Sequence, residues 1–306
     1  MRSKLWLYMA FISAIAFQSC KRKAPVKSFN DTYYSGSLVF AADETFAPIL
    51  DQELYIFKND HPGAKPIMRY RSEGDVVRLL MADSTRFVFL PRELTSEEVR
   101  QLRDRNLPPS VDKFAVDAVA IIVNQASQDT ATSVNEIKGM LRGQAKTDRS
   151  IVFDNPNSSL VRFLKEFTGL QEFRQKNIYA LKSDKEVIEY VSAHPNAIGI
   201  VGYNWLNDPD ADYAEAAKKV RILAVKDENS KTAPNQYFRP SQETLSLKEY
   251  PLRRNLYVVN CTGRKGLGEG FQQFIESDKG QRIVLRSGLL PVLIQERIIM
   301  IHSNKL

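Results

Sequence analysis

The polar residues Asn157, Ser158 and Ser159 form the segment whose side-chain types and spacing first suggest a binding function. They stand directly before apolar residues at helical spacing, in the stretch DNPNSSLVRFLKEF (154–167), so we expect them at the N-terminus of a helix. Side-chain oxygens of Asn and Ser there accept hydrogen bonds from backbone N–H groups that the helix leaves unpaired. The same N–H groups and hydroxyls can instead bind an anion. Helix capping and anion binding are therefore two interpretations of this segment.

The sequence lacks the short motifs of common catalytic mechanisms. It contains no G-x-S-x-G nucleophile elbow, no H-E-x-x-H zinc motif and no P-loop. The histidines His61 and His194 each precede a proline, which is typical of a loop, and His302 lies close to the C-terminus. Ser158 without a neighbouring base would be a poor nucleophile. We therefore expect no enzyme activity, no cofactor and no bound metal.

The N-terminus has the features of an export signal followed by a lipidation site. Two basic residues precede an apolar run from Leu5 to Phe17, which is short for a membrane-spanning helix and typical of a signal peptide. The run ends in FQSC, which resembles the lipobox of bacterial lipoproteins, in which the Cys carries the lipid. We expect residues 1–19 to be the signal peptide and Cys20 the lipidated residue. The alternative is an ordinary signal peptide that is cleaved near Ser19.

Residues 20–35 are polar and aperiodic, which predicts a tether between the lipid and the folded part. The basic residues 21–23 would lie against anionic lipid head groups, on the extracytoplasmic side of the cell envelope. If Cys20 carries lipid, the only other cysteine, Cys261, has no partner for a disulfide. The formal net charge is +7, but no basic stripe with interleaved aromatic residues stands out, so we do not expect nucleic-acid binding.

After the tether, strand-like and helix-like runs alternate, which predicts an α/β protein. Strand-like runs occupy residues 37–42, 67–71 and 86–94. A polar helix start follows each of the three, with Ser72 as one expected N-cap and Thr95 with Glu98 as a capping box. In open α/β sheets the ligand crevice lies beyond the carboxyl ends of the strands. The polar helix starts should therefore lie near a common ligand site.

Two long apolar runs, residues 114–124 and 250–260, bracket the middle of the chain. A continuous apolar run of this kind suits a strand that is buried on both faces. We expect two lobes, with the chain crossing between them twice. The first lobe would then consist of residues 36–115 and 251–306, and the second lobe of residues 116–250.

The folded part resembles the solute-binding proteins of phosphate ABC importers from about residue 37 to residue 292. Six stretches carry the resemblance in the order of that family: YRSEGDVVRLL, FLPRELTSEEV, DAVAIIVN, NAIGIVGYNWL, YPLRRNLYVVN and GFQQFIESDKGQRIVLRSGLLPV. The resemblance implies a two-lobed periplasmic-binding-protein fold, type II-like, with the ligand cleft between the lobes. It further implies an oxyanion ligand, phosphate or a similar ion, and ABC permease subunits as partners of a monomeric protein.

The resemblance also assigns residues to the ligand site. The positions that match the family's binding segments are Thr45, Phe46, Ser72, Arg92, Asn157, Ser158 and Ser159. Arg92 is the main candidate for the positive charge, since a guanidinium forms bidentate contacts with oxyanions. A surface salt bridge of Arg92 with Glu93 or Glu97 is the alternative.

The sequence departs from the family in two segments, and both carry acidic residues. The family usually has an Arg four residues before the Ser of its second-lobe segment, where this chain has Phe153 followed by Asp154. The first loop carries Asp43 and Glu44 where small hydroxyl residues are common. A carboxylate repels a bound anion unless it accepts the proton of a monoprotonated ion, so Asp43 and Asp154 are possible proton acceptors. A lipid-anchored interaction or sensor module, which kept the fold but lost or changed its ligand, is the alternative function.

Overall fold

The computed structural model describes residues 31–144 and 148–293, which contain one ten-stranded sheet and one three-stranded sheet. Along the large sheet the strands are β2 (Ala64–Arg71), β1 (Gly36–Asp43), β3 (Phe87–Leu90), β12 (Arg253–Asn260), β4 (Ser110–Asn124), β8 (Ala197–Gly202), β6 (Ser150–Phe153) and β7 (Ile178–Ala180), with β13 (Leu290–Pro291) and β9 (Val220–Ile222) also paired to β4. The small sheet contains β11 (Tyr237–Phe238), β10 (Ala224–Lys226) and β5 (Ala131–Ser133).

Strand β4 joins the two halves of the large sheet. It is buried from Phe114 to Asn124, as the apolar run predicts. Its first part pairs with β12, and its residues 119–123 pair antiparallel with β8. We call β1, β2 and β3 with their helices the first half, and β6, β7 and β8 with their helices the second half. The α/β class is confirmed, and two strands, β4 and β12, lie where the halves meet.

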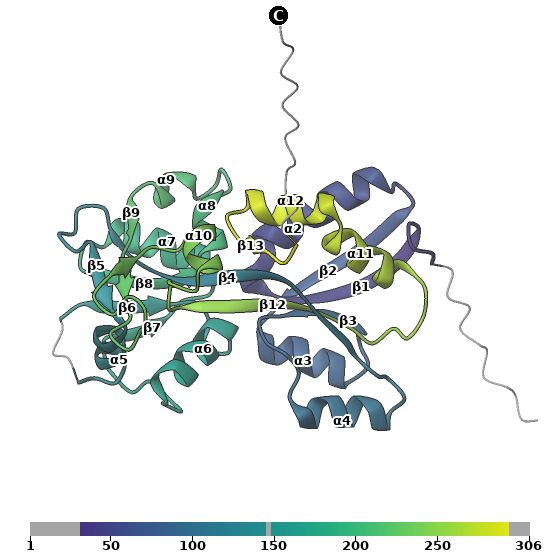
Figure 1. The fold of residues 1–306 in the computed structure, drawn as a ribbon, viewed down its shortest axis with the longest axis horizontal. Helices are drawn as coiled ribbons and strands as arrows, with labels where there is room; N and C mark the ends of the chain where they lie inside the picture. Colours follow the sequence, from purple (N-terminus) through teal and green to yellow (C-terminus); the bar gives the residue numbers. More distant parts are fainter. Residues whose placement is uncertain (1–30, 145–147, 294–306) are drawn as a thin grey trace, which may run out of the picture. The chain divides into compact units, whose positions relative to one another are not determined.

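Helices cover both faces of each half. The helical segments are η1 (Glu44–Phe46), α2 (Ala47–Asp60), α3 (Glu73–Met81), α4 (Ser96–Asp104), α5 (Val134–Leu141), α6 (Ser159–Thr168), α7 (Asp184–Ala193), α8 (Asn204–Asn207), α9 (Ala214–Ala217), α10 (Gln242–Ser246), α11 (Leu267–Glu276) and α12 (Asp278–Arg286). In the first half, α2, α11 and α12 lie on one face of the strands and α3 and α4 on the other (Figure 1). Each half thus has two hydrophobic cores, one per face of the sheet.

Several helices begin at a residue whose side chain caps the helix N-terminus. Ser72 caps α3 by accepting the N–H of Asp75, and Thr95 with Glu98 forms a capping box at the start of α4. Ser158 caps α6. These N-caps confirm the expected helix starts, because each depends on residues within three positions along the chain.

The end of the predicted tether packs on the fold. Asp31 accepts a hydrogen bond from the backbone N–H of Leu267 at 2.9 Å and pairs with Arg264 at 2.7 Å. Helix α11 has Gly266 at its N-cap, which carries no side chain for capping, so Asp31 supplies the acceptor instead. Residues 31–35 therefore contact the folded part, although the sequence analysis assigns them to the tether.

The signal peptide and the lipidation site at Cys20 lie outside the described residues, and the lobe boundaries stay predictions. In the described ranges, no helix combines the length and the apolar character that crossing a membrane requires.

Candidate anion-binding site

The end of β1 and the start of α6 meet at a buried cluster of hydrogen bonds. Oδ1 of Asp43 accepts the Thr45 N–H at 3.1 Å, the Thr45 hydroxyl at 2.5 Å and the Ser159 hydroxyl at 2.9 Å. The two hydroxyl oxygens lie 3.4 Å apart, and all three residues are fully buried. Thr45 follows the first strand, whereas Ser159 begins a helix of the second half. The structure thus brings together two predicted binding residues that are far apart in the sequence.

A buried arginine from β12 extends this cluster. Arg254 donates from Nη1 to the Ser159 hydroxyl at 3.2 Å, and from Nε and Nη2 to Oδ2 of Asp117 at 3.0 and 2.8 Å. Arg254 and Asp117 are register partners on β12 and β4. The guanidinium carbon lies 5.0 Å from the ring centroid of Phe46, a cation–π distance. Phe46 therefore contacts the cation of the site with its ring.

Sequence reasoning missed Arg254 and Asp117, although a signal was present. Each charge interrupts a long apolar strand, FAVDAVAIIVN or YPLRRNLYVVN. A charge within a strand that is buried on both faces needs a partner of opposite sign, because an unpaired buried charge is strongly disfavoured. Asp117 and Arg254 have opposite charges and lie in two strands that both cross between the halves. The sequence could therefore have predicted that they pair with each other.

Helix α8 holds the same loop from the second half. The side chains of Asn204 and Trp205 both donate to the carbonyl oxygen of Thr45, at 3.0 and 2.9 Å. The Thr45 backbone is therefore fixed by donors that come from the opposite half of the sheet.

The two interpretations of residues 157–159, helix capping and anion binding, apply to different residues of the segment. Ser158 is a cap, since its hydroxyl accepts the N–H of Val161 at 3.1 Å and donates to Oδ1 of Asp154 at 2.5 Å. Ser159 is the first residue of α6, and its hydroxyl lies against Asp43 and Arg254. Asn157 is exposed and is not part of the cluster.

Ser72 and Arg92 lie elsewhere. The Ser72 hydroxyl donates to Asp75 of its own helix at 2.9 Å. Arg92 donates to Glu73 at 2.7 Å and to both carboxylate oxygens of Glu98 at 2.8 Å. The structure does not bring Arg92 to the Asp43 cluster. Arg92 forms salt bridges, as in the alternative interpretation, but its partners are Glu73 and Glu98 in place of Glu93 or Glu97.

An ion-pair chain crosses from one half to the other beside the cluster. Glu73, at the start of α3, accepts Arg92 from its own half and Arg162 from α6, the latter at 2.8 Å. Arg162 also pairs with Glu166 on its own helix at 2.7 Å. The Glu73 side chain is only 5% exposed, so this ion pair is shielded from solvent.

The cluster is rich in buried carboxyl groups. Burial raises the pKa of Asp43, Asp117, Asp154 and Asp184 above that of an exposed aspartate, and nearby carboxylates raise the pKa of Asp154 and Asp184 further. Among the described residues, buried oxygens without a hydrogen-bond partner include Asp43 Oδ2, Asp117 Oδ1, Asp154 Oδ2 and Asn204 Oδ1. Unsatisfied buried polar atoms are rare and mark a place where a ligand or water can bind. Within residues 31–144 and 148–293, no group of three His, Cys, Asp or Glu side chains is placed to hold a metal ion.

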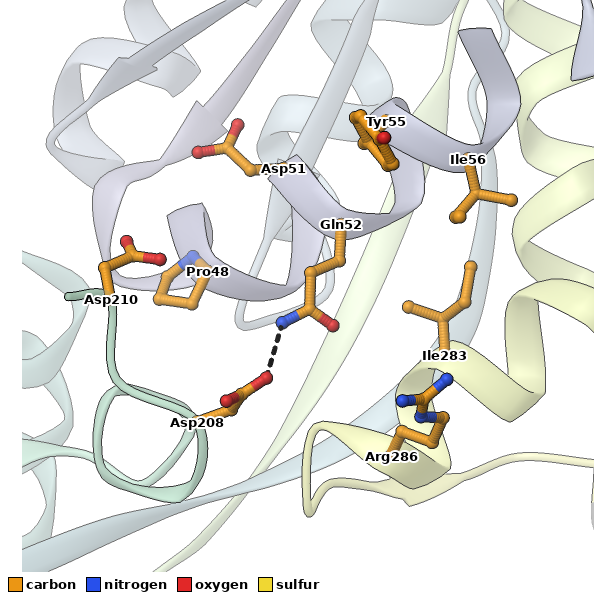
Figure 2. Close-up of a pocket in the computed structure, with 9 residues that line it drawn as sticks. All are labelled: Pro48, Asp51, Gln52, Tyr55, Ile56, Asp208, Asp210, Ile283 and Arg286. Carbon is orange, nitrogen blue, oxygen red and sulfur yellow. Dashed lines mark hydrogen bonds between the residues drawn. The ribbon is translucent and has the colours of Figure 1, made fainter. Parts of the chain in front are cut away.

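A separate pocket of about 570 Å³ lies between α2, the loop at residues 208–210 and α12 (Figure 2). Its lining residues are Pro48, Asp51, Gln52, Tyr55, Ile56, Asp208, Asp210, Ile283 and Arg286. The Gln52 amide donates to Asp208 at 3.5 Å across it (Figure 2). None of the predicted binding residues lines this pocket.

Comparisons with known proteins agree with this architecture. A family model described as a PBP superfamily domain matches residues 30–279. The phosphate-binding protein PstS of Staphylococcus epidermidis is 25% identical over 262 residues, which cover 80% of this chain and 76% of the relative. PstS of Borreliella burgdorferi is 27% identical over 271 residues, which cover 81% and 87%.

Solved structures give the same fold. A putative phosphate ABC transporter substrate-binding protein from Clostridium perfringens, solved with bound phosphate, has a TM-score of 0.71 at 17% identity, covering 84% of this chain and all of that one. An ABC-type phosphate transport receptor from Vibrio cholerae has a TM-score of 0.61 at 16% identity, with 83% and 99% covered. The fold is therefore that of the two-lobed binding proteins, and the chain belongs to the PBP superfamily.

Proposed function

We propose that this chain is an extracytoplasmic solute-binding protein that captures phosphate or a similar oxyanion for an ABC importer. One observation carries the proposal: a single buried carboxylate oxygen, Asp43 Oδ1, receives an N–H and two hydroxyls that come from both halves of the sheet. Donors arranged in this way around one oxygen also fit an oxygen of phosphate. The relatives that are named as phosphate-binding proteins support the same ligand.

Arg254 supplies the positive charge of the proposed site. Its guanidinium contacts Ser159 and is buried, so its attraction for an anion is weakly screened. The N-terminus of α6 adds a favourable dipole at the same place. The proposed ligand-binding residues are thus Thr45, Phe46, Ser159 and Arg254.

The other residues that the sequence analysis assigns to the ligand occupy different places. Ser158 would support the site as a cap, and Asp154 next to it remains a possible proton acceptor. Ser72, Arg92 and Asn157 have their contacts elsewhere in this structure, so a direct ligand role for them would require rearrangement. The protein would bind and release its ligand without chemical change, and the relatives favour such a role over a scaffold that lost its ligand.

Calorimetric titration of the purified mature protein with phosphate, sulfate, molybdate and an amino acid tests the function. We expect phosphate to bind, and Arg254→Gln to weaken its binding by about tenfold or more, because a hydrogen bond to a charged group contributes about 1.5 to 3 kcal/mol. Binding of the amino acid instead of the oxyanions would overturn the proposal.

The proposed cellular context is a monomer that is anchored through a lipid on Cys20 and delivers its ligand to ABC permease subunits. A Cys20→Ala variant should leave the membrane fraction or remain unprocessed. Membrane fractionation and the mass of the mature protein measure this. A variant that matures and fractionates as the wild type does would contradict lipid anchoring.

A further inference from the structure

The buried cluster contains its own anion. This inference rests on the proposed function and deepens it: we infer that Asp43 is an affinity-determining residue whose carboxylate competes with phosphate for the donors of the site. Oδ1 of Asp43 holds the Thr45 N–H, the Thr45 hydroxyl and the Ser159 hydroxyl at once. Phosphate can bind these groups only after it displaces the carboxylate.

Both hydroxyls already donate to the same carboxylate oxygen. The Thr45 and Ser159 hydroxyl oxygens are 3.4 Å apart, and both lie within 2.9 Å of the same Asp43 oxygen. Each hydroxyl has a single proton to donate, so a second oxygen receives no hydrogen bond from either hydroxyl while both protons are held by the carboxylate. Asp43 and an oxyanion therefore exclude one another from these donors.

Asp43 is held in this place from two directions. Locally it is the N-cap of η1, where its side chain accepts the N–H of Thr45 two residues later, a turn that Asp forms readily. Across the halves it accepts the hydroxyl of Ser159, beside Arg254. The carboxylate is thus tethered next to a cation and to donors that the proposed function assigns to the ligand.

Substitution of Asp43 separates this competitor role from the proton-acceptor role that the sequence suggests. Asp43→Ser keeps a residue that caps well but removes the negative charge. Asp43→Asn keeps the shape and serves as the second variant if Asp43→Ser does not fold. If the carboxylate competes, phosphate should bind both variants about tenfold or more tightly than the wild type. If it accepts the proton of bound hydrogenphosphate, both variants should bind more weakly.

Asp184→Asn is the matched control. Asp184 is a buried carboxyl group whose Oδ1 accepts the backbone N–H of Gly202 at 2.7 Å, a bond that an asparagine oxygen can keep. This variant removes a buried carboxylate without releasing the Thr45 or Ser159 donors, and we expect its phosphate affinity to change by less than about threefold.

Phosphate titration of the wild type and the three variants, with melting temperature as the check of folding, decides between the outcomes. Tighter binding by the Asp43 variants than by Asp184→Asn supports the inference. This holds also if the wild type binds phosphate too weakly to measure. If phosphate affinity rises equally in all three variants, the effect is general charge repulsion, and the inference is overturned. Equal or weaker binding by folded Asp43 variants, with a wild type that binds, overturns the inference alone. Absence of binding in every protein overturns it together with the proposed function.

Discussion

At the scale of single residues, the site depends on one buried ion pair. Arg254 forms an ion pair with Asp117 between β12 and β4, and Arg254 also donates a hydrogen bond to Ser159. Removing one partner of a buried pair leaves an uncompensated charge, which typically costs about 3 to 5 kcal/mol of stability. Replacing both partners by apolar residues is often tolerated.

Arg254→Met should therefore destabilise the protein strongly, whereas Arg254→Met combined with Asp117→Leu should recover much of the lost stability. Phosphate affinity should stay low in both variants, since both lack the guanidinium. Denaturant unfolding measures the first effect and calorimetry the second. A double variant that binds phosphate as the wild type does would show that the charge of Arg254 is structural only.

Another buried acid, Glu53, lies within α2. Both of its carboxyl oxygens lack a hydrogen-bond partner among the described residues, and burial raises its pKa to about 9. The folded protein then keeps a proton that the unfolded chain, with a glutamate pKa near 4.5, releases. The free energy of unfolding should fall as pH rises from about 4.5 to about 9, by at most about 1.4 kcal/mol per pH unit from this group.

Glu53→Met should remove this slope and stabilise the protein most at the alkaline end of the range. Urea unfolding at several pH values measures it. Glu243→Met, a change at an exposed glutamate of α10, is the control and should leave the slope unchanged. Parallel pH profiles for the wild type and Glu53→Met would contradict a proton held by Glu53.

At the scale of elements, the two neighbouring serines at the start of α6 have different roles. Ser158 binds the helix N–H of Val161, and Ser159 points to Asp43 and Arg254. Ser158→Ala should lower the free energy of unfolding by about 1 kcal/mol with little change in phosphate affinity.

Ser159→Ala should instead weaken phosphate binding by about tenfold, because it removes a donor to a charged ligand. Melting temperature and phosphate titration of the two single variants separate these effects. The assignment fails if Ser158→Ala loses affinity and Ser159→Ala does not.

Predictions from the sequence succeeded where the determining residues are close together along the chain. The sequence predicts Ser72 and Thr95 as caps, and capping is one of its two interpretations of Ser158, because a cap needs only the next three residues. The cap of α11 by Asp31 and the pairing of Arg254 with Asp117 join distant segments, and local spacing does not reveal which distant segments meet. Arg92 was expected at the anion for its guanidinium, but the glutamates Glu73 and Glu98 lie within its reach and bind it.

At the scale of the whole molecule, the contact between Glu73 and Arg162 joins the two halves. If the halves separate about β4 and β12 as a hinge, this ion pair must break. Arg162→Gln should therefore favour the open form and lower phosphate affinity. Glu166→Gln removes the other partner of Arg162, which lies on its own helix, and should have a much smaller effect.

Small-angle scattering with and without saturating phosphate measures this prediction. We expect a smaller radius of gyration for the wild type with phosphate, and a larger radius for Arg162→Gln without it. A radius that does not change on proven binding would contradict the hinge, and equal effects of both variants would contradict the role of the crossing ion pair.

The chain returns to the first half through β12, and this topology sets the order in which the two halves can complete their cores during synthesis. Phe271 and Phe274 of α11 pack in the same core as Phe40 and Phe57, which come from the beginning of the folded part. A polypeptide that is synthesised from its N-terminus cannot complete this core until its last segment arrives. The second half draws most of its core from the middle of the chain and can condense earlier. A nascent chain that stalls before residue 260 would therefore expose the aromatic surface of α2 and β1 to chaperones and proteases.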